Sequence, residues 1–362
     1  MKKSGYLLFL VTFILIGFGL VSIYSTSAIF ANEKFGDSLF FLKRQLLWAL
    51  LGSIAMLAAW KIKYELIRSL SKPLLFLTMI LLALVLFPPL GREAGGARRW
   101  LRIGGFSFQP SEVGKLALLI YLSDYLTRKQ SKIKKFSQGF LPPILVLGGM
   151  VGLILLQPDL GTGLLLGVVS LSLLFIAGAR ITYLTGLVLS SLPALYFLVV
   201  GVGYRQRRIL AFLDPWKDAS GVGYQITQSF IALGSGGMTG RGLVWSRQKL
   251  FYLPASYTDF IFSILGEELG FIGTASIVIL FLVFLWAGIR IAYRAPDLFG
   301  YLLGVGITMT ISLQAIINIG VATGSLPTKG IPLPFISFGG SSLLFNMIGV
   351  GLLLNISRRR KV

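Results

Sequence analysis

Residues 260–290 read FIFSILGEELGFIGTASIVILFLVFLWAGIR, an apolar run interrupted only by two adjacent glutamates and ended by an arginine. About 20 apolar residues are enough for an α-helix to cross a bilayer, so this run predicts a transmembrane helix. Nine further apolar runs cover residues 6–23, 40–59, 74–87, 112–126, 141–156, 161–177, 181–202, 298–320 and 341–356. The sequence therefore predicts an all-α polytopic membrane protein with ten transmembrane helices.

The composition agrees with this prediction and excludes several kinds of site. Of 362 residues, 55% are hydrophobic and 13% charged, whereas soluble domains have about 45–50% apolar and about 25% charged residues. The chain has no Cys and no His, which excludes disulfides, haem ligation, imidazole metal sites and a Ser-His-Asp triad. Acid–base chemistry must therefore come from Asp, Glu, Lys or Tyr. We attribute the net charge of +21 to membrane topology and expect no nucleic acid partner.

The basic residues set the expected orientation. Placing Lys2 and Lys3 in the cytoplasm gives the inner segments a small excess of Lys and Arg and puts both termini in the cytoplasm. Two outer loops, at about 88–111 and 203–258, then contain eleven Lys and Arg residues. This charge suits an anionic substrate, although attraction to anionic lipid headgroups accounts for it equally well. We expect one integral membrane domain over residues 1–362, with these loops forming the site and the longer one joining helices seven and eight.

Ionisable side chains inside membrane spans are costly, so they are candidates for a functional site. Glu112 and Lys115 are three residues apart and share one face of a helix. They form either an internal ion pair or part of a substrate cavity. Gln109 and Ser111 flank Pro110 at the start of this helix, and Ser111 fits its N-terminal cap.

Three further acidic residues lie near predicted helix ends or inside a predicted span. Asp159 follows Pro158 between two crossings, where it either caps the next helix or takes part in chemistry. Glu267 and Glu268 are expected about 12–13 Å deeper along a helix than Asp259, since each residue adds about 1.5 Å. At that depth they must be paired, protonated or in contact with water. They are also too far from Asp259 for a retaining glycosidase pair, whose carboxyl groups are roughly 5 Å apart.

Asp259 occupies the junction between the long outer loop and the apolar run 260–290. A carboxylate at the boundary between water and lipid is partly desolvated, which raises its pKa toward that of a useful base. Helix capping is the alternative role. Because the chain lacks His, Asp259 is the best-placed general base for a reaction outside the membrane.

The segment 326–342, LPTKGIPLPFISFGGSS, is apolar but contains three prolines within eight residues. Such a segment cannot continue a helix. Non-helical backbone at membrane depth is tolerated where it lines a cavity or is buried in protein. We therefore expect this segment, with Lys329 and Ser337, to border the site.

Several motifs occur in order along the chain. They are GARRW (96–100), FQPSE (108–112) with Lys115, QPDLGT (157–162), TDFIF (258–262), GEELG (266–270) and PLPFIS (332–337). Together they resemble the SEDS family (shape, elongation, division and sporulation), which comprises the RodA and FtsW proteins. The resemblance extends over all ten predicted helices.

The resemblance implies a peptidoglycan glycosyltransferase that polymerises lipid II into glycan strands, for cell division or cell elongation. It implies a multi-pass protein of the bacterial cytoplasmic membrane with an extracytoplasmic active site. It also implies that a class B penicillin-binding protein crosslinks the strands, together with other proteins of the division or elongation complex.

The family's essential residues map onto particular positions of this chain. Its essential aspartate matches Asp259, and its acid–lysine pair matches Glu112 and Lys115. Its important basic positions match Arg99 and Lys329. The sequence around these two basic residues resembles the FtsW-like division branch more than the elongation branch.

This chain departs from the family pattern at two positions before Asp259. Where members often have Glu-Ala-His, this chain has Ala-Ser followed by Tyr257. The acid that some members have eight positions before the aspartate is Phe251 here. An aspartate acting largely alone, or with a metal ion, is the remaining expectation.

We therefore expect glycosyl transfer with inversion, in which Asp259 takes a proton from the acceptor hydroxyl and fixed cations stabilise the leaving diphosphate. The expected cations are Arg99, Lys249 and Lys329, with Arg98 and Arg205 as further candidates. A divalent cation, Mg²⁺ or Mn²⁺, bridging carboxylate and phosphate oxygens would fit this chemistry, without an organic cofactor. Two alternatives stay open: a transporter that flips lipid II across the bilayer, and a non-catalytic scaffold of the cell-wall synthesis complex.

Overall fold

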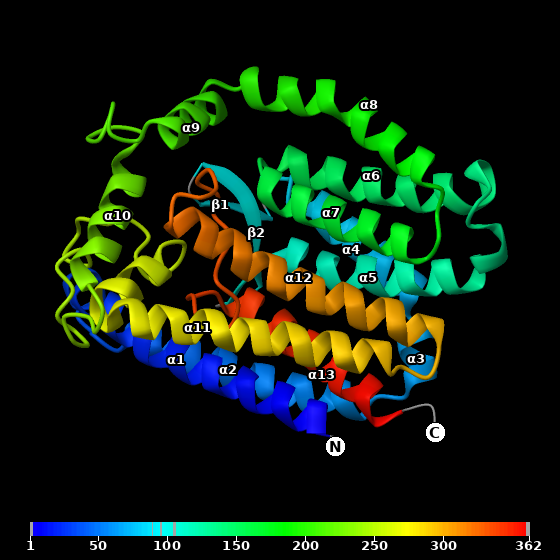
Figure 1. Cartoon of the computed structure of the whole chain (residues 1–362), viewed down its shortest axis with the longest axis horizontal. Coiled ribbons are helices and arrows are strands. Elements are labelled where there is room, and N and C mark those ends of the chain that lie inside the picture. Colours follow the sequence, from blue (N-terminus) through cyan, green and yellow to red (C-terminus); the bar gives the residue numbers. More distant parts are fainter. Residues whose placement is uncertain (1–2, 89, 95, 104–105, 360–362) are drawn as a thin grey trace.

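The computed structural model describes residues 3–88, 90–94, 96–103 and 106–359, so Lys2, Arg360 and Lys361 lie outside the described residues. Most helices run side by side in one bundle (Figure 1). The first half of the chain forms α1 (Lys3–Phe35), α2 (Phe40–Lys61), α3 (Tyr64–Ser69), α4 (Ser71–Leu84), α5 (Pro110–Arg128), α6 (Leu141–Leu156) and α7 (Leu160–Ile176). The second half forms α8 (Ile181–Val200), α9 (Gly203–Leu213), α10 (Tyr224–Gly236), α11 (Ile261–Tyr293), α12 (Leu298–Ala322) and α13 (Gly340–Arg358).

Each of the ten predicted crossings corresponds to a helix, so the prediction of an all-α polytopic membrane protein is confirmed. Among the described residues, seven helical segments are long and apolar enough to cross a membrane. Of the other three, α4 and α7 are apolar but have only 14 and 17 residues. The third, α5, has 19 residues and includes Glu112, Lys115, Asp124 and Arg128. These charges are tolerated because α5 is buried along nearly its whole length.

The centre of the bundle is formed by α5, α12 and α13, which have the largest buried faces. Helix α13 packs closely on α2 because Gly351 leaves room for the main-chain carbonyl of Met56, which a Cβ atom would displace. Helix α8 is the opposite case, because none of its residues is buried. In Figure 1 it arches outside the other helices and joins them only at its ends.

The first outer loop contains a small antiparallel sheet that the all-α prediction did not include. Its strands are β1 (Gly91–Ala94), β2 (Ala97–Ile103) and β3 (Phe106–Phe108), in that spatial order. The sheet lies at the end of the bundle opposite the N- and C-termini (Figure 1). Strand β3 leads directly into α5, and the Gln109 amide donates a hydrogen bond to Ser341 Oγ of α13 at 3.2 Å. The sheet is thereby attached to the helical core.

Helix α11 is broken at Gly270, whose φ of +66° and ψ of −164° are not helical. The long loop fills the break, since the amides of Phe271 and Ile272 donate to the carbonyls of Gly237 and Met238 at 2.9 and 3.1 Å. The sequence predicted a continuous span here, and that prediction was wrong. Glu267 and Glu268 therefore lie on a short segment before the break, because a glycine inside an apolar run does not reveal its conformation.

Two helices divide the long loop before Asp259. Helix α9 follows α8, whereas α10 packs against α11 at the end of the bundle that holds the sheet (Figure 1). Ser229 Oγ of α10 lies 2.6 Å from Ser263 Oγ and donates a hydrogen bond to the Ala322 carbonyl at 2.6 Å. The loop is therefore a packed part of the protein at this end.

Candidate active site

Asp259 lies in the turn that leads into α11. Its main-chain carbonyl accepts a hydrogen bond from Asn318 Nδ2 of α12 at 2.8 Å. The same amide nitrogen donates to the Ile331 carbonyl at 2.9 Å. Asn318 therefore holds Asp259 beside the segment that follows α12.

The proline-containing segment before α13 is fixed against the same turn by Ser337. Its hydroxyl donates a hydrogen bond to the Thr258 carbonyl at 2.6 Å and accepts one from the Leu333 amide at 2.8 Å. The next amide, that of Phe338, donates to the Tyr257 carbonyl at 3.0 Å. Ser337 thus acts through the backbone, and it sets the position of the residue before Asp259.

The Asp259 carboxylate faces Gly330. A Cβ atom at Gly330 would lie 3.2 Å from Asp259 Oδ2, so the glycine keeps this side of the carboxylate open. Asp259 is half-buried, and within the described residues its carboxylate oxygens accept no hydrogen bond. Desolvation raises the pKa of Asp259 to about 6, while the positive charges of Arg208 and Arg99 act in the opposite direction. A carboxylate with this pKa is suited to general-base catalysis near neutral pH.

Arg99 reaches the site from β2. Its Nε donates to the Gln157 carbonyl at 3.0 Å and its Nη2 to the Pro158 carbonyl at 2.5 Å. The following residue, Asp159, accepts hydrogen bonds from the Thr162 amide at 3.1 Å and the Thr162 hydroxyl at 2.9 Å. Asp159 therefore caps α7, which is one of the two roles expected from the sequence, and the turn between α6 and α7 holds Arg99 in place.

Lys329 lies next to Gly330 and is half-buried. Burial lowers the pKa of Lys329, and the nearby Asp159 carboxylate opposes this effect. Arg208 Nη1 of α9 donates to the carbonyl of the adjacent Thr328 at 3.1 Å. Cations from β2, α9 and the segment after α12 therefore surround the region of Asp259.

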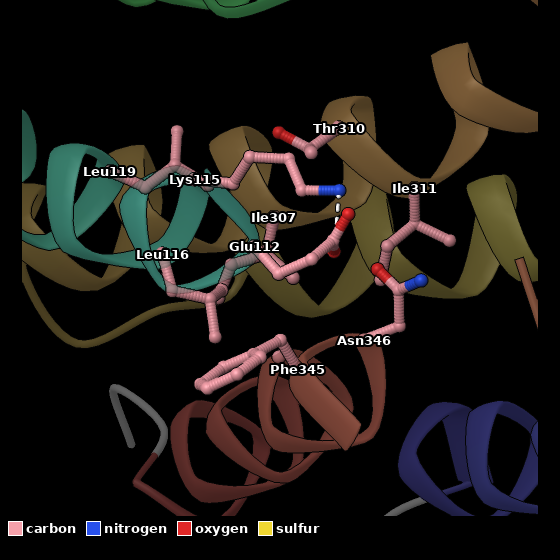
Figure 2. A pocket seen from close by; sticks show the side chains of 10 residues that line it. Glu112, Lys115, Leu116, Leu119, Ile307, Thr310, Ile311, Phe345 and Asn346 are labelled. Atoms are coloured by element: carbon pink, nitrogen blue, oxygen red, sulfur yellow. Dashed lines mark ion pairs between the residues drawn. The ribbon is translucent and has the colours of Figure 1, made fainter. Parts of the chain in front are cut away.

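A second polar site lies inside the bundle. Lys115 Nζ and Glu112 Oε2 form an ion pair of 2.8 Å, and both side chains are 6% exposed. Figure 2 shows the two side chains pointing toward each other among residues of α5, α12 and α13, including Thr310 and Asn346. The void beside them measures about 10 Å³, room for about one water molecule. This geometry agrees with the expected internal ion pair.

Ser111 does not cap α5. The helix begins at Pro110, so Ser111 lies inside its first turn and Gln109 occupies the capping position without a side-chain hydrogen bond. The proline was expected to precede the helix, but proline is favoured at the first helical position because its missing amide is not needed there.

Comparison with known proteins identifies the family. Residues 6–362 match the family described as cell cycle proteins, which comprises FtsW, RodA and SpoVE. The chain belongs to this family. A probable peptidoglycan glycosyltransferase FtsW of Geobacter metallireducens is 48% identical over 344 residues, 95% of this chain and 92% of that protein. The stage V sporulation protein E of Bacillus subtilis is 48% identical over 359 residues, 99% of this chain and 98% of that protein.

Solved structures agree with the family. The rod shape determining protein RodA of Thermus thermophilus has a TM-score of 0.72 and 28% identity, covering 98% of this chain and 97% of that one. A chain from a study of polymerization and crosslinking by a peptidoglycan synthase complex has a TM-score of 0.79 and 29% identity, covering 97% and 96%. The predicted SEDS membership is confirmed, and the FtsW and SpoVE relatives favour the FtsW-like branch.

Three basic residues that the sequence suggested as substrate ligands are engaged elsewhere in this SEDS protein. Lys249 Nζ is 2.8 Å from Glu268 Oε1, and the two side chains are 2% and 0% exposed. Arg205 Nη1 donates to the Leu198 carbonyl at the end of α8, at 2.7 Å. Arg98 Nη2 lies 3.8 Å from Glu93 Oε2. Lys249 is excluded from our substrate-binding set because its ammonium group is buried and paired.

Two residues near the SEDS aspartate were missed by sequence reasoning. Arg208 belongs to a basic run at 205–208, and only its position on α9 distinguishes it from Arg205 and Arg207. Asn318 is a buried amide inside an apolar helix, a sequence signal that was available but not used.

Proposed function

We propose that this chain is a peptidoglycan glycosyltransferase that polymerises lipid II on the outer face of the bacterial cytoplasmic membrane. The observation that carries the proposal is the Asp259 carboxylate, whose pKa is about 6 and whose neighbours include Arg208 and Arg99. Its oxygens accept no hydrogen bond within the described residues. A base in this state is available to a substrate hydroxyl.

In the proposed reaction, Asp259 takes the proton from the 4-hydroxyl of the GlcNAc residue of the acceptor lipid II. The resulting oxygen nucleophile attacks the anomeric carbon of the donor from the face opposite the leaving group. The bond from this carbon to the diphosphate oxygen breaks, and undecaprenyl diphosphate leaves with the electron pair. The configuration is inverted, and Asp259 then releases its proton to solvent.

The leaving diphosphate requires fixed positive charge. Arg99, Lys329 and Arg208 supply it, because their positions are set by the backbone around Asp259 before the substrate arrives. Such preorganised groups stabilise charge that develops in the transition state without reorganising during the reaction. The guanidinium groups also suit phosphate oxygens through paired hydrogen bonds.

The proposed orientation follows from the two ends of the bundle. The described ends of the chain, Lys3 and Arg359, lie at the end opposite the sheet and α10 (Figure 1). With the termini in the cytoplasm, the Asp259 region faces outward. A class B penicillin-binding protein is the proposed partner, since glycan strands formed at this face need crosslinking there, alongside other division or elongation proteins.

The role of a metal ion is limited by the available ligands. Within the described residues, no group of three or more acidic side chains could hold one. A Mg²⁺ or Mn²⁺ ion would therefore depend on substrate diphosphate oxygens, with the Asp259 carboxylate as its protein ligand. The residues do not by themselves form a metal site, and the proposed steps need none.

The decisive experiment reconstitutes the purified chain with its penicillin-binding protein and labelled lipid II. Asp259→Ala should abolish glycan strands on a gel, whereas wild type makes them. Strands formed at the wild-type rate by the variant would refute the proposed base.

The same preparation separates the alternatives. A lipid II transporter would still flip labelled lipid II across vesicles when Asp259 is replaced, and wild type would make no strands. A scaffold would recruit its partner without making strands in either form.

A further inference from the structure

Two buried glutamates after Asp259 bind the chain segment that precedes it. Glu267 accepts hydrogen bonds from Ser246 Oγ at 2.5 Å, from the Arg247 amide at 3.0 Å and from the Gln248 amide at 3.2 Å. Arg241 Nη1 also lies 3.6 Å from Glu267 Oε1. The carboxylate therefore replaces a regular backbone ladder for this stretch of the loop.

Glu268 connects the same stretch to a different helix. Its Oε1 lies 2.8 Å from Lys249 Nζ, and Ser25 Oγ of α1 donates to both carboxylate oxygens at 2.6 and 2.7 Å. Lys249 Nζ also donates to Ser25 Oγ at 3.2 Å. We refer to Ser25, Lys249 and Glu268 as the buried triad.

The buried triad closes a loop that has Asp259 near its middle. Lys249 precedes Asp259 by ten residues and Glu268 follows it by nine, so their ion pair joins the two ends of the intervening segment. Ser25 fixes this junction to α1, which packs extensively against α11. The position of the Asp259 turn relative to the bundle therefore depends on the buried triad as well as on Asn318.

The cost of the arrangement indicates a role other than stability. A buried ion pair rarely stabilises a fold more than apolar residues of the same size, because both charges lose their hydration. The side chains of Lys249 and Glu268 are 2% and 0% exposed, so this cost applies in full. What the pair provides is one defined geometry, since an ammonium and a carboxylate with a shared hydroxyl have few alternative arrangements.

We propose that the buried triad of Ser25, Lys249 and Glu268 positions Asp259 for catalysis by closing its loop against α1. This inference rests on the proposed glycosyltransferase function. The three residues are positioning residues, because they act through the loop and touch no reacting atom. A shift of about 1 Å in a catalytic group is enough to reduce turnover about a hundredfold.

The test is the double variant Lys249→Met/Glu268→Gln, assayed with wild type in the reconstituted lipid II system. Both replacements keep the side-chain size and remove the charges together, so neither leaves an unpaired buried charge. We expect kcat to fall about tenfold to a hundredfold while KM for lipid II stays within about twofold of wild type. Thermal unfolding should show that the variant is folded.

Ser25→Ala provides a second test that keeps the ion pair. It removes only the connection to α1, and we expect a kcat loss of about threefold to tenfold with unchanged KM. Ser22→Ala is the matched control, since Ser22 is equally buried one turn earlier on α1 but donates only to the Phe18 carbonyl within the described residues, at 2.5 Å. It should leave kcat unchanged.

The outcomes separate this inference from the function on which it rests. If wild type makes no glycan strands, the proposed function fails and the inference fails with it. If wild type is active and the folded double variant has wild-type kcat, the inference alone is refuted. Equal losses in Ser25→Ala and Ser22→Ala would also refute it, because the loss would then reflect packing of α1.

Discussion

Asp259 and Glu268 are nine residues apart on the chain, yet their carboxylates have opposite surroundings. Glu268 is fully buried and bonded to an ammonium and a hydroxyl. Asp259 is half-buried, is held only through its main-chain carbonyl, and has cations nearby that do not bond to its oxygens within the described residues. The difference shows how one acid can be committed to structure while a neighbouring acid is kept available for chemistry.

The largest effect on this contrast is expected from removing the cation nearest to Gly330. Lys329→Met should lower kcat with lipid II about a hundredfold, because the leaving diphosphate loses a fixed positive charge. Initial rates over a range of lipid II concentrations measure this. Lys43→Met is the control, since Lys43 is an exposed cation paired with Asp37. Unchanged kinetics in Lys329→Met would remove this residue from the site.

A smaller loss is expected from closing the open side of Asp259. Gly330→Ala places a methyl group 3.2 Å from Asp259 Oδ2, where it blocks approach of the acceptor hydroxyl. We expect kcat/KM to fall about tenfold. Gly148→Ala is a suitable control because a Cβ atom there has no neighbour within 4 Å. Equal activity of both variants would show that the acceptor reaches the carboxylate from another side.

The available state of Asp259 should also cost stability. Its pKa is raised from 3.8 to about 6, so the folded state is penalised for the charged carboxylate above pH 6 and not below pH 3.8. Asp259→Asn should therefore stabilise the protein at pH 7.5, by about 1–2 kcal/mol after allowing for partial exposure. Thermal unfolding at pH 7.5 and pH 5 measures this. The gain should shrink at pH 5, where Asp259 is largely protonated.

The smallest effect concerns the pH profile. Activity should fall as the pH drops below about 6, because Asp259 becomes protonated. Arg208→Gln removes a nearby positive charge, which raises the pKa of Asp259 and moves this acidic limb to higher pH, with a rate at pH 6 roughly threefold lower. Arg207→Gln, one residue earlier and exposed, should not move the limb. A limb that stays in place in Arg208→Gln would contradict the proposed interaction.

Apolar runs were sufficient to predict the transmembrane helices, because hydropathy depends on local sequence alone. The same signal did not show the break at Gly270, where the backbone conformation is set by the loop residues Gly237 and Met238. It also did not show the sheet in the first outer loop, whose three strands are short and partly polar.

The candidate site was only partly predictable for a related reason. Asp259 and Lys329 were found through their motifs and their positions beside apolar runs. Lys249 was assigned to the substrate because its partner Glu268 is 19 residues away and was expected inside a continuous span. Arg208 was missed because a sequence does not show which arginine of a basic run faces a distant carboxylate.

Helix α8 has 20 residues and none of them is buried. Most helices of a folded protein obtain their lateral contacts from other helices, whereas α8 must obtain nearly all of them from acyl chains. Its tilt will therefore respond to bilayer thickness, and detergent will replace its natural surroundings more completely than those of any helix in the core. For this part of the chain, the surrounding lipid is a component of the tertiary structure.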